Sequence, residues 1–199
     1  MEITAGRVKE LRERTGVGMM ECKTALVEAE GDVAAAEKIL RKRGLSAAAN
    51  KSGRATGEGA VGSYIHMGSK IGVLVEINCE TDFAARNDDF QALVHEIAMH
   101  IAAASPRFVR REDVPETVLR DEREIATEQV RKSGKPEAVA EKIIEGKIEK
   151  FFSESCLLDQ PYVKDPEKTV AQLVAERVAR IGENIQISRF TRYVLGEGV

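Results

Sequence analysis

Hydrophobic positions in the first 45 residues repeat at the three- to four-residue spacing of amphipathic helices. One helix is predicted from about Thr4 to Arg14 and a second from about Gly18 to Glu30, each followed by a glycine that permits a left-handed stop. A third helix is predicted to begin after Asp32, which can cap it, and to end at Gly44. The three helices together predict a very small bundle.

Residues 46–60 are small, polar and rich in glycine, which predicts a linker with an optional helical start. Beyond this segment the hydrophobic period changes from helical to alternating. Strands are predicted at 62–67 and 70–80, joined by a turn at Gly68-Ser69. The positions that alternate, and that should face one side of a sheet, are Ile71, Val73, Val75, Ile77 and Cys79.

Helical periodicity returns after a turn-rich segment at 81–89. A helix is predicted from about Asp88 to Ala104, where Ser105-Pro106 ends it. Two charged helices at 116–132 and 136–152, with a tight connection at 133–135, predict an antiparallel hairpin that projects from the body. The thin apolar stripe of this hairpin consists of Val118, Ile125, Val139, Ile143 and Phe151.

The remaining elements complete an α+β class. Asp165 and Pro166 predict the start of a helix that runs to about Ile181, and residues 185–195 can supply a third strand. The predicted organisation is an N-terminal three-helix domain (1–45), a linker (46–60) and an α+β domain (61–199). In the α+β domain, helices cover one face of a small antiparallel three-stranded sheet, and the helical hairpin lies at about 116–152.

Composition argues against several classes of protein. The formal net charge is −3, only 5% of the residues are aromatic and there is no tryptophan, so a nucleic-acid partner is not expected. Three isolated cysteines without a CxxC pair predict reduced thiols rather than disulfides or zinc ligands. The N-terminus has no apolar signal core and no segment approaches the ~18 apolar residues of a membrane span. We therefore expect a soluble, cytoplasmic protein without a membrane partner.

Two sequence motifs suggest chemistry that their context does not support. Residues 57–62 match GxGxxG, but a linker precedes them and a strand follows, the reverse of a dinucleotide site. His95, Glu96 and His100 nearly match the zinc motif HExxH, but the five-residue gap rotates the second imidazole by about 140° on a helix. Neither a cofactor, a bound metal nor an enzymatic activity is expected. A metal-dependent hydrolase using His95, Glu96 and His100 remains an alternative.

Four segments resemble the elongation factor Ts family, and they occur in the family's order over the whole chain. They are LRERTGVGMMECKTAL (11–26), GSYIH (62–66), EINCETDFAARN (76–87) and RIGENI (180–185). The resemblance implies a ubiquitin-associated-like (UBA-like) fold for the N-terminal helices. It also implies binding to elongation factor Tu, both GDP-bound and nucleotide-free. In this family, binding dislodges Mg²⁺ and releases GDP so that GTP can enter, without covalent chemistry.

The resemblance also assigns residues. Those that match the family's segment beside the partner's magnesium site are Thr81, Asp82, Phe83 and Ala84. Those that match other contacts with elongation factor Tu are Met19, Met20, Lys23, His66, Ile181 and Gly182. Longer members carry the Thr-Asp-Phe and Gly-Ser-Tyr-x-His motifs on two core halves, whereas here we expect His66 and Asp82 to lie in one compact unit. Short members pair as homodimers, so the resemblance implies a homodimer.

Taken one at a time, the same residues have simpler interpretations. Phe83 could cap the core of the sheet, and Asp82 could cap a helix or turn. Met19 and Met20 are adjacent on a helix, so they cannot both point fully inward, and at least one is expected at the surface. A second alternative function is a ubiquitin-associated-type protein-binding module fused to an unrelated α+β domain.

Overall fold

The computed structural model of the protein describes residues 3–132 and 137–197. The chain forms two compact units that are assembled from separated stretches of sequence. Of the described residues, the first comprises 3–60, 77–94 and 172–186, and the second comprises 61–76, 95–132, 137–171 and 187–197. Each unit is a group of residues in mutual contact and need not be a domain. The predicted division into domains at 1–45, 46–60 and 61–199 therefore stays a prediction.

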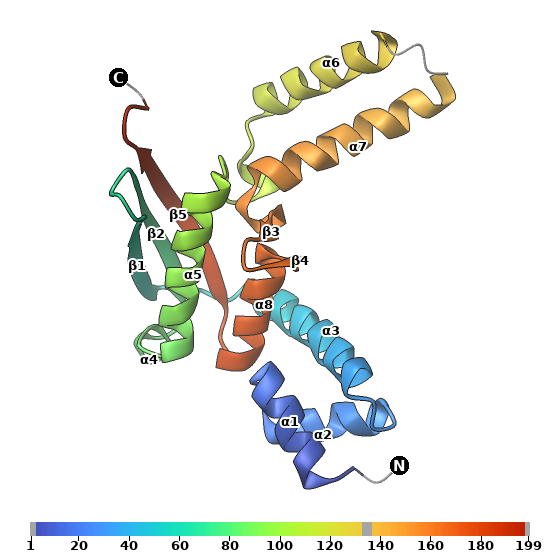
Figure 1. Ribbon diagram of the computed structural model, residues 1–199, viewed down its shortest axis with the longest axis vertical. Helices are drawn as coiled ribbons and strands as arrows, with labels where there is room; N and C mark the ends of the chain where they lie inside the picture. The colour runs from blue at the N-terminus through green and yellow to red at the C-terminus, as the bar shows by residue number, and fades with distance from the viewer. Residues whose placement is uncertain (1–2, 133–136, 198–199) are drawn as a thin grey trace. The chain divides into compact units, whose positions relative to one another are not determined.

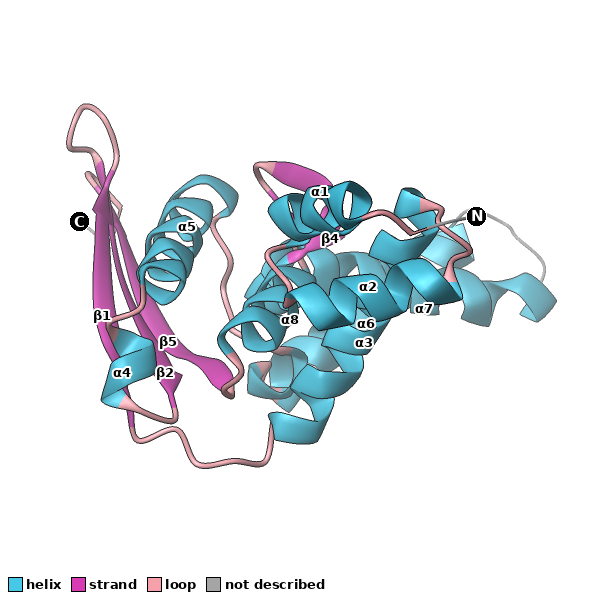
Figure 2. Ribbon diagram, turned by 90° about the horizontal axis from the view of Figure 1, so that it is seen from below, coloured by secondary structure: helices cyan, strands magenta, loops and turns pink. Residues whose placement is uncertain are grey.

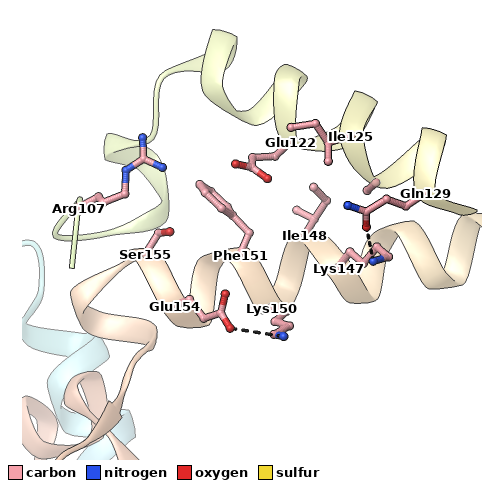
Figure 3. A pocket seen from close by; sticks show the side chains of 11 residues that line it. Arg107, Glu122, Ile125, Gln129, Lys147, Ile148, Lys150, Phe151, Glu154 and Ser155 are labelled. Carbon is pink, nitrogen blue, oxygen red and sulfur yellow. Dashed lines mark hydrogen bonds and ion pairs between the residues drawn. The ribbon is translucent and has the colours of Figure 1, made fainter. Parts of the chain in front are cut away.

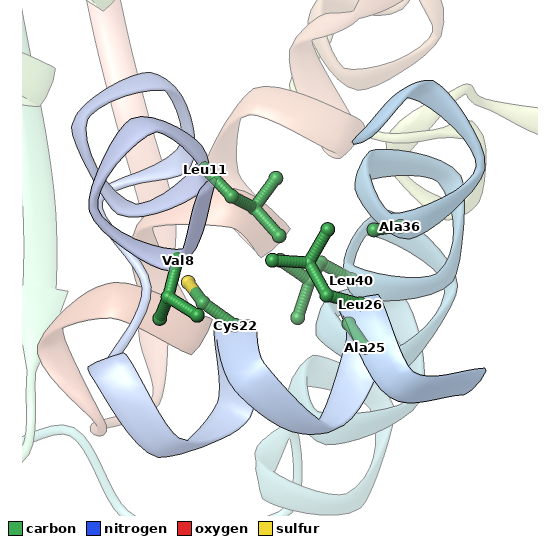
Figure 4. Packing of buried hydrophobic residues seen from close by; sticks show 7 residues of the cluster. All are labelled: Val8, Leu11, Cys22, Ala25, Leu26, Ala36 and Leu40. Carbon is green, nitrogen blue, oxygen red and sulfur yellow. The ribbon is translucent and has the colours of Figure 1, made fainter. Parts of the chain in front are cut away.

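The first three helices form a bundle in the first unit, as predicted. They are α1 (Ala5–Thr15), α2 (Met19–Glu28) and α3 (Val33–Lys51). Thr4 caps α1 by accepting the N–H of Arg7, and Asp32 caps α3 by accepting the N–H groups of Ala34 and Ala35. Figure 4 shows the buried core between the helices, formed by Val8, Leu11, Cys22, Ala25, Leu26, Ala36 and Leu40.

The prediction that the third helix ends at Gly44 is wrong, because α3 continues to Lys51. An internal glycine costs a helix only about 1 kcal/mol relative to alanine, and the alanines that follow at 47–49 favour the helix strongly. Gly44 is buried, and a Cβ there would lie 3.4 Å from the Cβ of Ala179 in helix α8 (Val170–Ile181). The glycine therefore allows a close approach between two helices instead of ending one.

Three strands form an antiparallel sheet in the order β1-β2-β5 (Figure 1). They are β1 (Glu58–Ile65), β2 (Ile71–Cys79) and β5 (Ile185–Val194). The alternation predicted for β2 is confirmed, since every second residue from Val73 to Cys79 is buried. The GxGxxG letters lie mostly in β1, where a Cβ at Gly59 would collide with the carbonyl of Ile77. This glycine therefore permits close strand pairing.

One face of the sheet is covered and the other is open. Helix α5 (Asp88–Ala104) has the predicted bounds, and its predicted apolar stripe, Phe90, Leu93, Val94, Ile97 and Ile101, is buried. Within the second unit, Arg192 on β5 donates to the carbonyl of Ala102, and the ring of Tyr64 on β1 packs edge-on against His95. Helix α5 therefore lies along one face of this sheet, as Figure 2 shows.

The opposite face of the sheet, which we call the outer face, carries exposed apolar side chains. They are Val61 and Ile65 on β1, Leu74 on β2 and Tyr193 on β5, and each is at least half exposed. Arg189 on β5 pairs with Glu76 on β2 at 2.7 Å, which places this polar pair on the same face. Exposed apolar side chains in one patch are typical of a surface that binds another protein.

The helical hairpin in the second unit consists of α6 (Glu116–Lys132) and α7 (Glu137–Ser155). Its helices run antiparallel and extend away from α5 (Figure 1). The predicted connection at 133–135 lies outside the described residues. The predicted stripe is wrong at Ile125 and Val139, which are 51% and 43% exposed. The buried side of α6 includes Ala126 and Val130, which lie about one helical turn apart. Ala126 directly follows Ile125 in the sequence.

A pocket of about 360 Å³ lies beside the hairpin and is lined by both of its helices and by Arg107 (Figure 3). Apolar side chains, such as those of Ile125 and Phe151, form part of its wall. Lysines 147 and 150 and glutamates 122 and 154 add charges of both signs. The pocket therefore does not present a field of one sign to a ligand.

The predicted helix start at Pro166 is wrong. Pro166 lies in β4 (Asp165–Thr169), which pairs antiparallel with β3 (Pro161–Tyr162), and α8 begins only at Val170. A proline in the first turn of a helix and a proline in a short, two-stranded ribbon are both tolerated, because neither position needs the missing N–H. The local signal therefore could not distinguish them. Short 3₁₀ turns at Arg111–Asp113 and Leu157–Asp159 complete the second unit.

The two histidines of the near-HExxH motif have separate roles. His100 is fully buried, with its Nε2 2.9 Å from Oε1 of Gln160, and its Nδ1 accepts the N–H of Val163. His95 is exposed and packs against Tyr64. No group of three or more potential metal ligands occurs within the described residues. The hydrolase alternative therefore has no support in this part of the chain. In the same residues, no helix is long and apolar enough to cross a membrane.

We expect acid to destabilise the fold through His100. Burial lowers the pKa of His100 below its ordinary value of 6.5, although the hydrogen bond to Gln160 partly opposes this. The unfolded chain therefore binds the proton first, so stability falls as the pH drops below about 6.5 and continues to fall until the lower folded-state pKa is passed. Urea unfolding at about pH 7.5 and pH 5 should show this loss, and the loss should shrink in His100→Gln. An equal loss in the variant would contradict the assignment.

Candidate functional site

The residues that the resemblance predicts to lie beside a partner's magnesium site form the cap and the first residues of a short helix directly beyond β2. Thr81 is the N-cap of α4 (Asp82–Ala85), and its Oγ1 accepts the N–H of Ala84 at 3.2 Å. Ala84 and Ala85 are buried, so this side of the helix packs inside the first unit. Phe83, between them and the cap, is 81% exposed. The segment from Thr81 to Ala84, which we call the 81–84 segment, thus presents an aromatic ring to solvent on a fixed support.

Both simpler interpretations of this segment are wrong. Phe83 does not cap the core of the sheet, because its side chain is exposed. Asp82 does not cap the helix, because Thr81 does. The Asp82 carboxylate instead accepts a hydrogen bond from Arg86 at 2.9 Å, one turn further on, in a partly exposed pair. Such a pair is weak in water, so the carboxylate stays available to another partner.

Sequence reasoning did not single out Glu183, which contacts the 81–84 segment directly. Its carboxylate accepts the hydroxyl of Thr81 at 2.6 Å and the backbone N–H groups of Glu80 and Thr81 at 3.1 and 3.0 Å. The only signal for it was its place in the segment 180–185. No local pattern could show the contact, because about a hundred residues separate the two sides.

Cys79 supports the same turn from inside the sheet. Its thiol is buried and donates to the carbonyl of Thr81 at 3.2 Å. Burial raises the pKa of Cys79, and the negative charge of Glu183 raises it further. The thiol therefore stays protonated at neutral pH and keeps its role as a hydrogen-bond donor to the turn.

The predicted contacts on α2 are all exposed. Met19 and Met20 are 42% and 72% exposed, so both lie at the surface, and Lys23 is exposed as well. Val27, which sequence reasoning missed, is 57% exposed and lies one turn beyond Lys23. Flexible methionine side chains suit a surface that adapts to a partner.

The remaining predicted contacts lie at two places. Gly182 ends α8 in the left-handed conformation (φ 89°), with its N–H donating to the carbonyl of Val178, and Ile181 before it is half-buried. These two residues directly precede Glu183, so they adjoin the support of the 81–84 segment. His66 lies in the second unit, exposed after β1, with its Nδ1 3.1 Å from the hydroxyl of Tyr64. The expectation that His66 and Asp82 lie in one compact unit is wrong, because Asp82 belongs to the first unit.

All predicted site residues except His66 belong to the first unit. Helix α8 and the bundle also meet in this unit. A Cβ at Gly16, which ends α1 at φ 69°, would collide with the side chain of Arg180, and Arg180 pairs with Asp89 at 2.7 Å. The bundle that carries Met19 and Met20 therefore packs closely on the helix that leads to Glu183.

Comparisons with known proteins agree with the resemblance. The sequence model of the family described as elongation factor TS matches residues 34–197. An elongation factor Ts of Anaeromyxobacter sp. is 65% identical over 198 residues, which are 100% of this chain and 90% of the relative. One of Geobacter sulfurreducens is 61% identical over 199 residues, which are 100% and 92% of the two chains. One of Thermosipho melanesiensis is 58% identical over 195 residues, which are 98% and 100%.

These matches run from the helical bundle to the last strand, so the two parts of the chain share one family. The alternative of a ubiquitin-associated-type module fused to an unrelated α+β domain is not supported, because the family match extends from α3 into β5. The chain belongs to the elongation factor Ts family, a family of translation elongation factors.

Proposed function

We propose that this chain is a guanine-nucleotide exchange factor for elongation factor Tu. It binds the GDP-bound form, displaces Mg²⁺ and GDP, and holds the nucleotide-free form until GTP enters. The chain makes and breaks no covalent bond in this cycle, so it is not an enzyme in the usual sense. The observation that carries the proposal is the exposed ring of Phe83 on a helix whose backbone is held by its cap and its buried alanines.

The ring supplies a driving force for insertion into a partner. Burying a phenylalanine side chain that is exposed in the free protein contributes roughly 1.5–3 kcal/mol. Each tenfold acceleration of GDP release needs about 1.4 kcal/mol off the barrier. Phe83 can therefore account for about 10- to 100-fold acceleration, and a larger effect needs the rest of the interface.

The neighbouring carboxylate acts on the ion. Elongation factor Tu holds Mg²⁺ through oxygen ligands and the phosphates of GDP, as hard cations require. Asp82 is partly exposed beside Phe83 and brings a negative charge to that site. This charge competes with the phosphates for the cation and repels them. Because coupling is reciprocal, GDP must weaken the binding of this chain as much as the chain weakens the binding of GDP.

Two further surfaces fit contacts on the same partner. Met19, Met20 and Lys23 offer an adaptable apolar patch with one positive charge on α2. Ile181 and Gly182 lie next to the support of the 81–84 segment. His66, which is exposed in the second unit, is a further proposed contact.

A stopped-flow assay tests the proposal. Elongation factor Tu loaded with a fluorescent GDP analogue is mixed with excess unlabelled GDP, with and without the chain. We expect the chain at substoichiometric amounts to accelerate release of the analogue and to be reused. Release at the same rate with and without the chain would refute the exchange function.

We also propose that the chain acts in the cytoplasm as a homodimer, without nucleic acid or membrane partners. The exposed apolar residues of the outer face support the dimer, because a second copy can cover them. Light scattering should give twice the 21.8 kDa mass of one chain. Leu74→Glu should give the mass of one chain, since it places a charge in the centre of that face. A dimer that persists in Leu74→Glu would show that another surface forms it.

A further inference from the structure

Two loops that are far apart in the sequence hold each other beside the 81–84 segment. One oxygen of Glu183 accepts the backbone N–H groups of Glu80 and Thr81, and the other accepts the hydroxyl of Thr81 at 2.6 Å. In return, the carboxylate of Glu80 accepts the backbone N–H of Asn184 at 2.6 Å. Hydrogen bonds to an ionised carboxylate are about twice as strong as neutral ones.

We call the mutual hydrogen bonds of Glu80, Thr81, Glu183 and Asn184 the clasp. The hydroxyl of Thr81 connects this clasp to the helix that carries the ring. The hydroxyl donates to Glu183 and, through its oxygen, accepts the N–H of Ala84. The rotamer that caps α4 is therefore the rotamer that Glu183 selects. Phe83 lies within the turn that this cap closes, so the direction in which its Cα–Cβ bond projects the exposed ring depends on the same contact.

The support for Glu183 is itself fixed. Asn184 is buried, and its side-chain amide donates to the carbonyls of Arg54 at 2.8 Å and Ser52 at 3.4 Å. Gly182, which precedes Glu183, closes the end of α8 through its N–H. A side chain held on both sides in this way can fix the position of another group without touching the partner.

We propose that Glu183 is a positioning residue for Phe83 and that it sets the rate of nucleotide release rather than the strength of docking. The inference rests on the exchange function proposed above. Insertion of a ring beside a bound ion needs a defined direction, and a misplacement of about 1 Å can cost up to 100-fold in rate. Docking through Met19, Met20 and Lys23 does not involve the clasp, so we expect docking to persist when the clasp is removed.

The experiment compares Glu183→Ala and Glu183→Gln with Glu145→Ala, which removes an exposed glutamate on α7. Three quantities are measured: GDP release at saturating chain, the Kd of the initial complex with GDP-bound elongation factor Tu, and the Tm. Glu183→Ala should slow release by about tenfold and change the Kd by less than about threefold. Glu183→Gln should recover most of the rate, because its amide oxygen can accept both N–H groups and its amide nitrogen can donate to the hydroxyl oxygen of Thr81. Glu145→Ala should match the unchanged chain.

The same substitution in a Phe83→Ala variant shows whether Glu183 acts through the ring. In Phe83→Ala, adding Glu183→Ala should cause no further loss, because no ring remains to be positioned. A further tenfold loss in that background, or a Kd that rises as much as the rate falls, overturns the inference. If Glu183→Ala lowers the Tm strongly, Thr81→Val tests the same contact by removing only the hydroxyl, and a full rate there also overturns it.

The two proposals fail in different ways. A slow Phe83→Ala with a fast Glu183→Ala refutes the positioning role and leaves the exchange function intact. A chain that does not accelerate release even when unchanged refutes the exchange function, and the positioning role with it.

Discussion

Replacing Phe83 with alanine should slow the GDP release that this chain stimulates on elongation factor Tu by about 10- to 100-fold. The expected loss follows from the roughly 1.5–3 kcal/mol that burial of the ring in the partner contributes. The free energy of unfolding should change by less than about 0.5 kcal/mol, because the side chain is 81% exposed in the free chain. Stopped-flow release of a fluorescent GDP analogue and urea unfolding measure the two quantities.

A matched control removes an exposed apolar side chain elsewhere. Val139→Ala on the hairpin truncates a residue that is 43% exposed. This variant should stimulate GDP release from elongation factor Tu at the same rate as the unchanged chain. A Phe83→Ala chain that is stable and fully active would show that the ring does not take part. A comparable loss in both variants would point to a general effect of surface hydrophobicity.

Replacing Phe90 with alanine should have the opposite profile. Phe90 lies seven residues after Phe83 but is fully buried on the covered side of α5. Truncating a buried phenylalanine to alanine typically costs 3–5 kcal/mol, because contacts are lost and a cavity remains. Urea unfolding should therefore show a loss of about 3–5 kcal/mol in Phe90→Ala.

The folded fraction of Phe90→Ala should still accelerate GDP release, since Phe90 has no exposed surface to offer a partner. Activity per folded molecule, corrected by circular dichroism, separates this case from that of Phe83. A loss of stability below about 1 kcal/mol would contradict the packing described for α5.

The regular hydrophobic patterns predicted their elements well. The alternation in β2 and the broad stripe of α5 gave the correct element types, and the bounds of α5 agree with the prediction. Both elements bury one face, so the periodicity of the sequence records which face it is. The covered face of the sheet could therefore be predicted from residues alone.

The predictions failed where local signals have two meanings. Gly44 can end a helix or let a neighbouring helix approach, and here it faces Ala179. Pro166 can start a helix or lie in a short ribbon, and here it lies in β4. The choice depends on tertiary contacts that no window of sequence contains.

The sequence predicted which residues form the candidate site but not how they are arranged and held in space. The residue types at 81–84 fitted a capped turn or a core cap equally well, and only the resemblance favoured an exposed role. Glu183 remained unassigned because its partners, Glu80 and Thr81, are more than a hundred residues away. The bonds that hold the ring become apparent only when the two loops are placed side by side.

The most direct test of the account places a photo-crosslinking benzoylphenylalanine at position 83 and irradiates the complex with nucleotide-free elongation factor Tu. Position 193, on the outer face, serves as the control site. The account predicts a crosslink from position 83 to the residues around the magnesium and phosphate site of elongation factor Tu, and no crosslink from position 193 to elongation factor Tu. A crosslink from position 83 only to a second copy of this chain, or to a part of elongation factor Tu remote from the nucleotide, would contradict it.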